Sequence, residues 1–133
     1  MKKKWLIGVL LLIVLVIIII VVVINFKKEK LITESTPLFE MKEYQNITAD
    51  KIEQINIIRY TEGGSDSTLE EDKKEIERTY HYLSQLRVGK ETDMACEDNT
   101  TIYILQLQEE ETVSIEIECD WIVMNNKRYT IIK

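Results

Sequence analysis

Few side chains in this sequence have the chemistry needed for catalysis or for holding a metal ion. The chain contains two cysteines, Cys96 and Cys119, and one histidine, His81. A serine or cysteine nucleophile needs a base and a group that orients it, and no motif of that kind surrounds His81. Two cysteines and one distant histidine fall short of the four ligands of a structural zinc site. The sequence therefore predicts no enzyme, no metal centre and no cofactor, and His81 is expected on a helix surface.

The two cysteines are candidates for a disulfide. Cys119 ends a predicted strand, and residues 97–100 can turn the chain back so that Cys96 lies within the roughly 4.4–6.8 Å Cα separation that a bridge needs. In the chain-entropy model such a bridge stabilises the fold by about 3 kcal/mol. The alternative is two buried thiols, with Cys119 continuing the apolar face of its strand. The residues leave both interpretations open.

Residues 62–72 combine five carboxylates with two glycines. They lack the alternating Asp/Asn and terminal Glu of a calcium loop, so a flexible turn followed by the start of a helix is the preferred interpretation. A ligand or divalent-cation sensor built on this loop is the alternative function. Trp121, Ile102 and Ile104 form a third candidate, because strand alternation puts them on one sheet face as a contact surface. The competing interpretation of that face is a second, partly covered core.

Residues 6–24 contain eighteen Ile, Leu or Val and one Gly, with no charged or polar side chain. Nineteen residues of helix span roughly 28 Å, close to the hydrocarbon thickness of a bilayer. A cleaved signal peptide has a shorter apolar core and a small-residue cleavage site, and neither is present. The pattern predicts an uncleaved transmembrane signal-anchor helix over residues 5–26.

The charges beside this run predict its orientation. The short lysine cluster before it should stay inside the cell, which puts residues 1–4 in the cytoplasm and the C-terminal domain outside a cell membrane. Aromatic side chains at both ends suit the headgroup region. The expected membrane-interface residues are Trp5, Phe26, Lys2, Lys3, Lys4, Lys27 and Lys28.

Two further segments follow the predicted anchor. Residues 27–47 have weak periodicity and hold the only proline, Pro37, which is typical of a stem or linker. Residues 48–133 predict a small α+β domain, an antiparallel sheet packed by one helix in the order β-α-β-β-β-β. The expected helix opens with a capping box at Thr68 and ends near Gly89.

Two hairpins make up the last third of the predicted domain. In the first, a turn at residues 109–111 would pair Leu107 with Val113, Leu105 with Ile115 and Tyr103 with Ile117. In the second, Asn125 and Asn126 form a tight turn, because asparagine tolerates positive φ angles. That turn would set Tyr129 opposite Ile122.

Charge limits the class of partner. The chain has a net charge of −6, and beyond the first four residues 14 Lys and Arg stand against 23 Asp and Glu. Nucleic-acid binding depends on clustered Lys and Arg, so no nucleic-acid partner is expected. The expected partners are the membrane itself and another membrane or cell-envelope protein.

The lysine-started anchor, residues 51–57 (KIEQINI), 74–83 (KEIERTYHYL) and 126–131 (NKRYTI) together resemble small uncharacterised extracytoplasmic proteins of Gram-positive bacteria. The resemblance covers roughly residues 48–133 and holds no catalytic motif. Such domains follow either a lipoprotein signal or a membrane anchor, and the lipid-accepting cysteine is absent here. The resemblance carries no activity that can be assigned to a residue. An anchor, a stem and a domain without catalytic groups instead lead us to expect a single-pass, membrane-anchored extracytoplasmic binding or accessory module.

Overall fold

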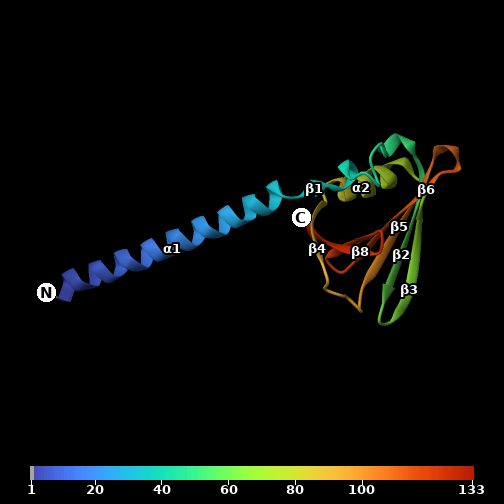
Figure 1. The fold of residues 1–133 in the computed structure, drawn as a ribbon. Coiled ribbons are helices and arrows are strands. Elements are labelled where there is room, and N and C mark those ends of the chain that lie inside the picture. Colours follow the sequence, from blue (N-terminus) through green and yellow to red (C-terminus); the bar gives the residue numbers. More distant parts are fainter. Residues whose placement is uncertain (1) are drawn as a thin grey trace. The chain divides into compact units, whose positions relative to one another are not determined.

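The computed structural model describes residues 2–133, with the side chains of all of these except 31–33. It divides into two compact units that meet between Glu34 and Ser35. The first unit is one long helix, α1, over Lys2–Thr33 (Figure 1). It includes the predicted span 5–26 and runs beyond it. Met1, part of the predicted segment 1–4, lies outside the described residues.

The second unit is one antiparallel sheet of eight strands with one α-helix, so the predicted α+β class is confirmed. The strands lie in the order β1-β4-β8-β7-β6-β5-β2-β3. Strands β5 to β8 pair with their neighbours in sequence, β5 also pairs with β2, and β8 also pairs with β4. The bounds are β1 Thr36–Pro37, β2 Ile52–Thr61, β3 Gly64–Glu70, α2 Lys73–Ser84, β4 Arg87–Thr92, β5 Thr100–Leu107, β6 Thr112–Glu118, β7 Trp121–Met124 and β8 Lys127–Ile132.

Three of these strands were not predicted: β1, β3 and β4. Residues 62–67 were expected to form a flexible loop, but Gly64–Glu70 pairs with β2 along its whole length. The helix therefore starts later than the predicted capping box at Thr68. Its N-cap is Asp72, whose side chain accepts a hydrogen bond of 2.8 Å from the Lys74 amide. Pairing with β2 supplies more backbone hydrogen bonds than one capping box, which explains the difference.

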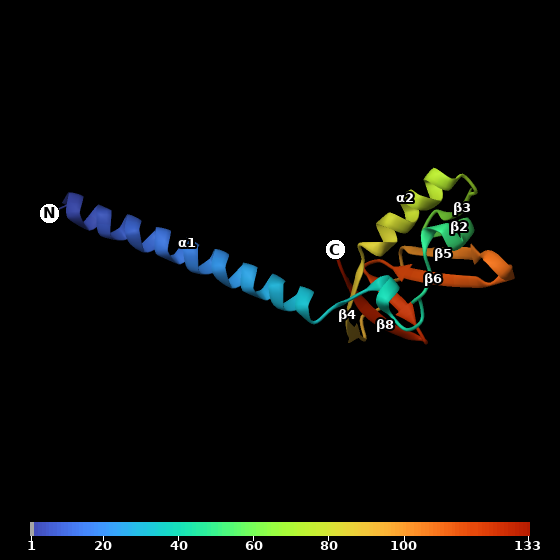
Figure 2. The same cartoon turned by 90° about the horizontal axis from the view of Figure 1, so that it is seen from above.

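The core lies between one face of the sheet and a layer made of α2 and residues 35–51 (Figures 1 and 2). α2 buries Ile76 and Leu83. Tyr80 joins the two parts of this layer, because its hydroxyl donates to the Ile47 carbonyl at 3.1 Å and its ring stacks on Phe39 at 4.6 Å. The sheet contributes fully buried side chains from four adjacent strands, β2, β5, β6 and β7, namely Ile55, Leu105, Ile115 and Ile122.

The predicted stem over residues 27–47 is wrong. Its first part continues helix α1 to Thr33, and its second part belongs to the folded domain. Leu38 is fully buried, and Tyr44 and Ile47 are each exposed by no more than 6%. A polar segment with a few well-spaced apolar residues has no periodicity, yet those residues can cover apolar side chains of a sheet. Segment 35–47 folds onto the sheet because it removes such side chains from water.

The first C-terminal hairpin differs from the predicted register by two residues. Leu105 pairs with Val113 and Tyr103 with Ile115, because the turn comprises residues 108–110 and not 109–111. A shift of two leaves each side chain on its predicted face. Three consecutive glutamates give no residue-type signal for the position of the turn. The second hairpin is confirmed, with positive φ at Asn125 and Asn126 and with Tyr129 opposite Ile122.

Gly89 does not end the helix, which stops at Ser84. It lies in β4, where a Cβ atom would overlap the Thr130 hydroxyl oxygen of β8. A side chain there would require the Thr130 hydroxyl to move, and the Ile132 side chain and the Thr130 carbonyl already lie 3.4 and 3.5 Å away. The glycine that was expected to terminate a helix therefore permits close approach of two strands.

Candidate interaction surface on the open face of the sheet

The sheet face opposite the α2 layer, the open face, carries a group of partly exposed apolar side chains. Strand pairing sets Ile58 beside Ile102, and Asn56 between Ile104 and Leu69. Leu69 is 52% exposed and Tyr60, on the same face, is 46% exposed. These five apolar residues, the isoleucine cluster, are Ile58, Tyr60, Leu69, Ile102 and Ile104.

Sequence reasoning identified Ile102 and Ile104 but missed their neighbours on β2 and β3. Leu69 was assigned to a turn and helix start, so it had no place on a sheet face. The alternation in residues 55–60 is broken by consecutive isoleucines, which hid the second face of β2. The Gly63-Gly64 pair, which directly follows the β-branched run of residues 55–61, was the available signal for a hairpin there.

Trp121 lies on the same open face, as predicted, but none of its partners on the neighbouring strands belongs to the isoleucine cluster. It pairs with Glu118 of β6 and Thr130 of β8. The next residue of β6 on this face, Glu116, pairs with both Ile102 and Val123. A row of carboxylates therefore separates Trp121 and Val123 from the isoleucine cluster.

One ion pair crosses the open face at this row. The Arg128 guanidinium Nε donates to a Glu118 carboxylate oxygen at 2.6 Å, and the Glu118 side chain is only 14% exposed. The hydrogen bond and the charge of Glu118 raise the pKa of Arg128 above its usual range. The pair links β6 to β8 across β7, so this part of the face is polar. The apolar contact area lies on either side of it.

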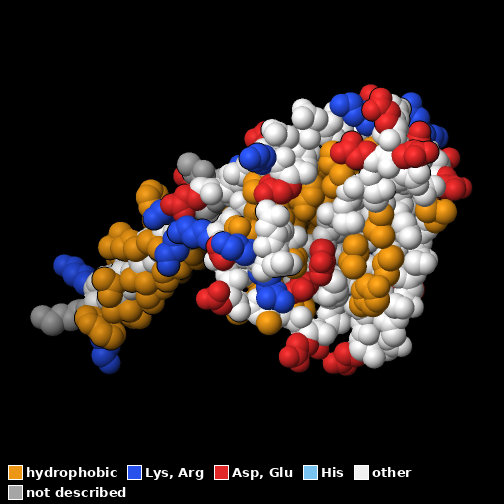
Figure 3. Space-filling model, turned by 45° about the vertical axis from the view of Figure 1, so that its right-hand side comes forward, with side chains coloured by type: hydrophobic (Ala, Val, Ile, Leu, Met, Phe, Trp, Pro, Cys, Tyr) orange, Lys and Arg blue, Asp and Glu red, His pale blue; other side chains and the backbone are white. Residues whose placement is uncertain are grey.

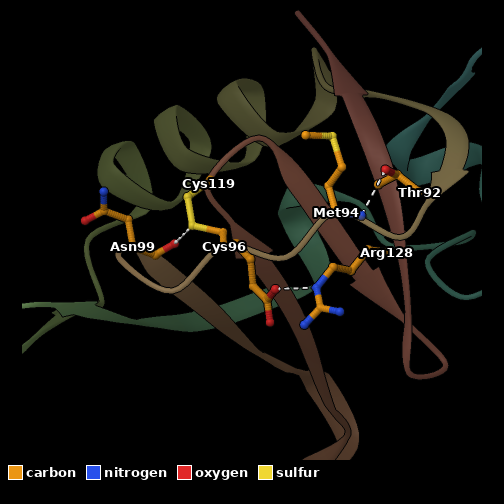
Figure 4. A network of polar contacts seen from close by, with 7 residues as sticks. Thr92, Met94, Cys96, Asn99, Cys119 and Arg128 are labelled. Atoms are coloured by element: carbon orange, nitrogen blue, oxygen red, sulfur yellow. Dashed lines mark hydrogen bonds and ion pairs between the residues drawn. A yellow bond between two sulfur atoms is a disulfide. The ribbon is translucent and has the colours of Figure 1, made fainter.

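Cys96 and Cys119 are joined in a disulfide, with their Cα atoms 6.1 Å apart (Figure 4). The bridge ties the connection between β4 and β5 to the turn between β6 and β7. The Cys119 amide also donates to the Asn99 carbonyl at 2.8 Å. Of the two interpretations left open by the sequence, the bridged pair is the one found. It fixes the end of the sheet at which Trp121 begins β7.

The acidic residues of segment 62–72 are distributed along a strand and its two ends. Asp66 pairs across from Arg59 on β2, and Glu70 accepts a hydrogen bond of 2.7 Å from the Thr79 hydroxyl of α2. Asp72 caps α2. Within residues 2–133 no three His, Cys, Asp or Glu side chains gather as a metal site would require. This segment is the second strand of a β-hairpin at the edge of the sheet, with the start of α2 after it.

His81 lies on the exposed side of α2, where it was expected. Its ring nitrogen Nε2 is 3.0 Å from the Gln85 side-chain nitrogen. An open groove of about 390 Å³ lies elsewhere, between residues 45–51 and the β5–β6 turn. Its lining includes Lys51, whose ammonium donates to the Asn46 carbonyl at 3.0 Å. Neither place combines a nucleophile, a base and an orienting group.

Helix α1 exposes nearly all of its large apolar side chains between Trp5 and Phe26 (Figure 3). Over Lys2–Lys30 it is long and apolar enough to cross a membrane. Among the residues that the structure describes, α1 alone meets this criterion. Trp5 and Phe26, the predicted interface aromatics, are 72% and 69% exposed. The predicted interface lysines lie on the same helix, Lys2, Lys3 and Lys4 at its start and Lys27 and Lys28 beyond Phe26.

Comparisons with known proteins found no match: no family model, no curated protein and no solved structure is similar to this chain.

Proposed function

We propose that this protein is a single-pass, membrane-anchored binding or accessory module without enzymatic activity, with α1 in the cell membrane, its N-terminus in the cytoplasm and domain 35–133 outside. The observation that carries the proposal is the combination of a fully exposed apolar helix with a domain that leaves apolar side chains on its open face. In the hydrocarbon core of a bilayer the backbone groups must bond within the segment, which a continuous helix such as α1 allows.

The charge pattern supports the orientation. Three lysines precede the apolar run without an acidic side chain among them, whereas Glu29 lies among the lysines that follow it. Short clusters of Lys and Arg favour the cytoplasmic side. The disulfide also supports an outside domain, because such bonds persist in oxidising compartments.

The short tether restricts where the module acts. Only residues 25–34 separate the end of the apolar run from the folded domain. Even fully extended, ten residues reach no more than about 35 Å. The partner we propose is therefore another membrane or cell-envelope protein whose surface comes close to the bilayer.

Topology is tested by thiol labelling of the full-length protein in intact cells. We expect a membrane-impermeant maleimide to label Cys96 and Cys119 only after treatment with an impermeant phosphine reductant. Labelling that requires opening of the membrane would place the domain inside and overturn the orientation. A variant with both cysteines replaced by alanine is the control for background labelling.

Binding through the open face is tested by position-specific crosslinking in intact cells. A photoreactive phenylalanine analogue replaces Ile102, or Trp121, or the exposed Glu77 of α2 as the matched control. We expect a discrete crosslinked product from the open-face positions and none from position 77. Equal products from all three positions, or none from any of them, would refute a contact role for the open face.

A further inference from the structure

The two edges of the sheet are protected to very different degrees. Edge strand β1 has two residues, and one of them is Pro37, which has no amide hydrogen to offer. Edge strand β3 has seven residues, Gly64–Glu70, and pairs with β2 without a bulge. It contains no proline and no lysine, and its only charged side chains are the carboxylates Asp66 and Glu70. Charges on an edge strand hinder pairing with an uncharged or like-charged strand, so β3 is an edge protected by acidic charge alone.

The side chains of β3 define two different surfaces beside that edge. Asp66, Thr68 and Glu70 point to the α2 side of the sheet, because they pair with Arg59, Ile57 and Ile55. Ser65, Ser67 and Leu69 lie on the open face, next to the isoleucine cluster. A strand added to β3 would meet carboxylates on one of its faces and an apolar surface on the other.

The acidic character of the edge decides between a second copy and another partner. Two β3 strands from two copies would bring Asp66 and Glu70 of both chains onto one face, where like charges repel. Glu62, in the turn before β3, adds a further negative charge. Segment 59–72 has five carboxylates and, in Arg59, a single basic side chain. Charge complementarity therefore selects a basic segment.

We propose that β3 binds an extended segment of a partner protein as a ninth strand, and that this segment alternates Lys or Arg with apolar residues. The basic side chains face Asp66 and Glu70, and the apolar ones cover Leu69 and extend the isoleucine cluster. Backbone hydrogen bonds along the edge supply affinity, and the alternating side chains supply specificity. The inference rests on the proposed function of a binding module and specifies the chemistry of its partner.

A synthetic probe tests this edge directly. The probe is a capped heptapeptide of alternating Lys and Val, and its control has Glu in place of each Lys. The full-length protein is held in phosphatidylcholine nanodiscs, a lipid without net charge, so that the basic peptide is not drawn to the membrane. We expect the Lys peptide to slow amide hydrogen exchange in Gly64–Glu70 and to leave β4, which lies next to the opposite edge strand β1, unchanged. The Glu peptide should have no effect.

Charge reversal gives the second arm. Asp66→Lys should weaken binding of the Lys peptide roughly fivefold or more, since one ion pair is lost and a repulsion is gained. Glu97→Lys, an exposed carboxylate in the connection between β4 and β5, makes the same change in net charge and should leave binding unaltered. Unchanged melting temperatures would show that both variants fold.

Four outcomes would overturn the proposal: no binding of the Lys peptide, equal binding of the Glu peptide, protection outside β3, or dimers of the protein formed through β3. The crosslinking at Ile102 and Trp121 is read separately. If the peptide fails while those crosslinks persist, the edge proposal falls and the proposed function stands. If the peptide binds but the domain proves to be cytoplasmic, the proposed function falls and the edge proposal stands.

Discussion

Arg87 donates hydrogen bonds to Ser35 from two of its guanidinium nitrogens. The guanidinium Nε donates to the Ser35 hydroxyl at 2.8 Å, and Nη2 donates to the Ser35 main-chain carbonyl at 3.0 Å. Ser35 is the first residue of the folded unit and is only 6% exposed, while Arg87 begins β4. The start of the domain is thus fastened to its sheet directly after α1 ends.

Replacing Arg87 should therefore loosen the start of the domain. We expect Arg87→Ala to lower the free energy of unfolding by about 1–3 kcal/mol, because buried polar atoms of Ser35 lose charged donors. Arg87→Lys should recover part of the loss, since lysine keeps the charge but not the forked geometry. Thermal unfolding in detergent, followed by circular dichroism, measures the change. An equal effect from Arg78→Ala, an exposed arginine on α2, would contradict the assignment.

Leu38 should behave as a core residue, although its segment has the composition of a linker. We expect Leu38→Ala to destabilise the fold by about 2–5 kcal/mol, the usual range for a fully buried leucine. The matched control is Glu40→Ala, because Leu38–Glu40 form one short 3-10 helix and Glu40 is exposed to solvent. If both variants melted like the wild type, residues 35–47 would be a linker after all. Chemical unfolding in detergent distinguishes the two cases.

Removal of the disulfide should cost stability without changing the fold. The bond closes a loop with a sequence separation of 23 residues, so we expect a loss of about 3 kcal/mol in the Cys96→Ala, Cys119→Ala double variant. A reducing agent should lower the melting temperature of the wild type and leave that of the double variant unchanged. A wild-type protein that melts identically with and without reductant would show that the bridge is not formed in solution.

Gly89 and Thr130 should show coupled effects. We expect Gly89→Ala to destabilise the sheet by roughly 1–3 kcal/mol, because the new methyl group overlaps the Thr130 hydroxyl. Thr130→Ala removes that atom and should reduce the cost of Gly89→Ala in a double-mutant cycle. Gly63→Ala is the control, since its Cβ would meet no atom closer than 3.9 Å. Purely additive effects would mean that β4 and β8 shift apart without strain.

The buried Tyr44 should make the fold sensitive to strongly alkaline pH. Burial, followed by the nearby charges of Glu43 and Glu116, raises the pKa of Tyr44 from 10.0 to about 12. Below pH 10 the phenol is protonated in the folded and unfolded chain alike. As the pH rises from 10 to 12 the unfolded chain ionises first, so the folded state loses stability, by an amount on the order of 2 kcal/mol.

Absorbance of tyrosinate at alkaline pH, recorded together with unfolding, measures this effect. In Tyr44→Phe we expect the slope of stability between pH 10 and pH 12 to flatten. Tyr60→Phe, a change at an exposed tyrosine, serves as the comparison. A slope that persists undiminished in Tyr44→Phe would assign the alkaline sensitivity to other groups.

The sequence by itself determined the features that depend on local chemistry. The apolar run of residues 6–24 requires a helix in lipid whatever its neighbours are, and the helical spacing of Ile76 and Leu83 identified α2. Asn125 and Asn126 marked a tight turn because of their tolerance of positive φ. The alternating faces of β5 and β6 also followed from residue type, since a two-residue error in register leaves the faces unchanged.

Tertiary structure alone decided what depends on contacts between distant residues. Gly64–Glu70 has few apolar side chains and becomes a strand only because β2 offers a complete row of hydrogen-bonding partners. Leu38 and Tyr44 lie in a polar segment, and they are buried because the end of the core needs covering. The open edge at β3 is likewise a property of strand order, which no local pattern encodes. Non-local pairing, set by the sheet as a whole, therefore created the surface that we propose for binding.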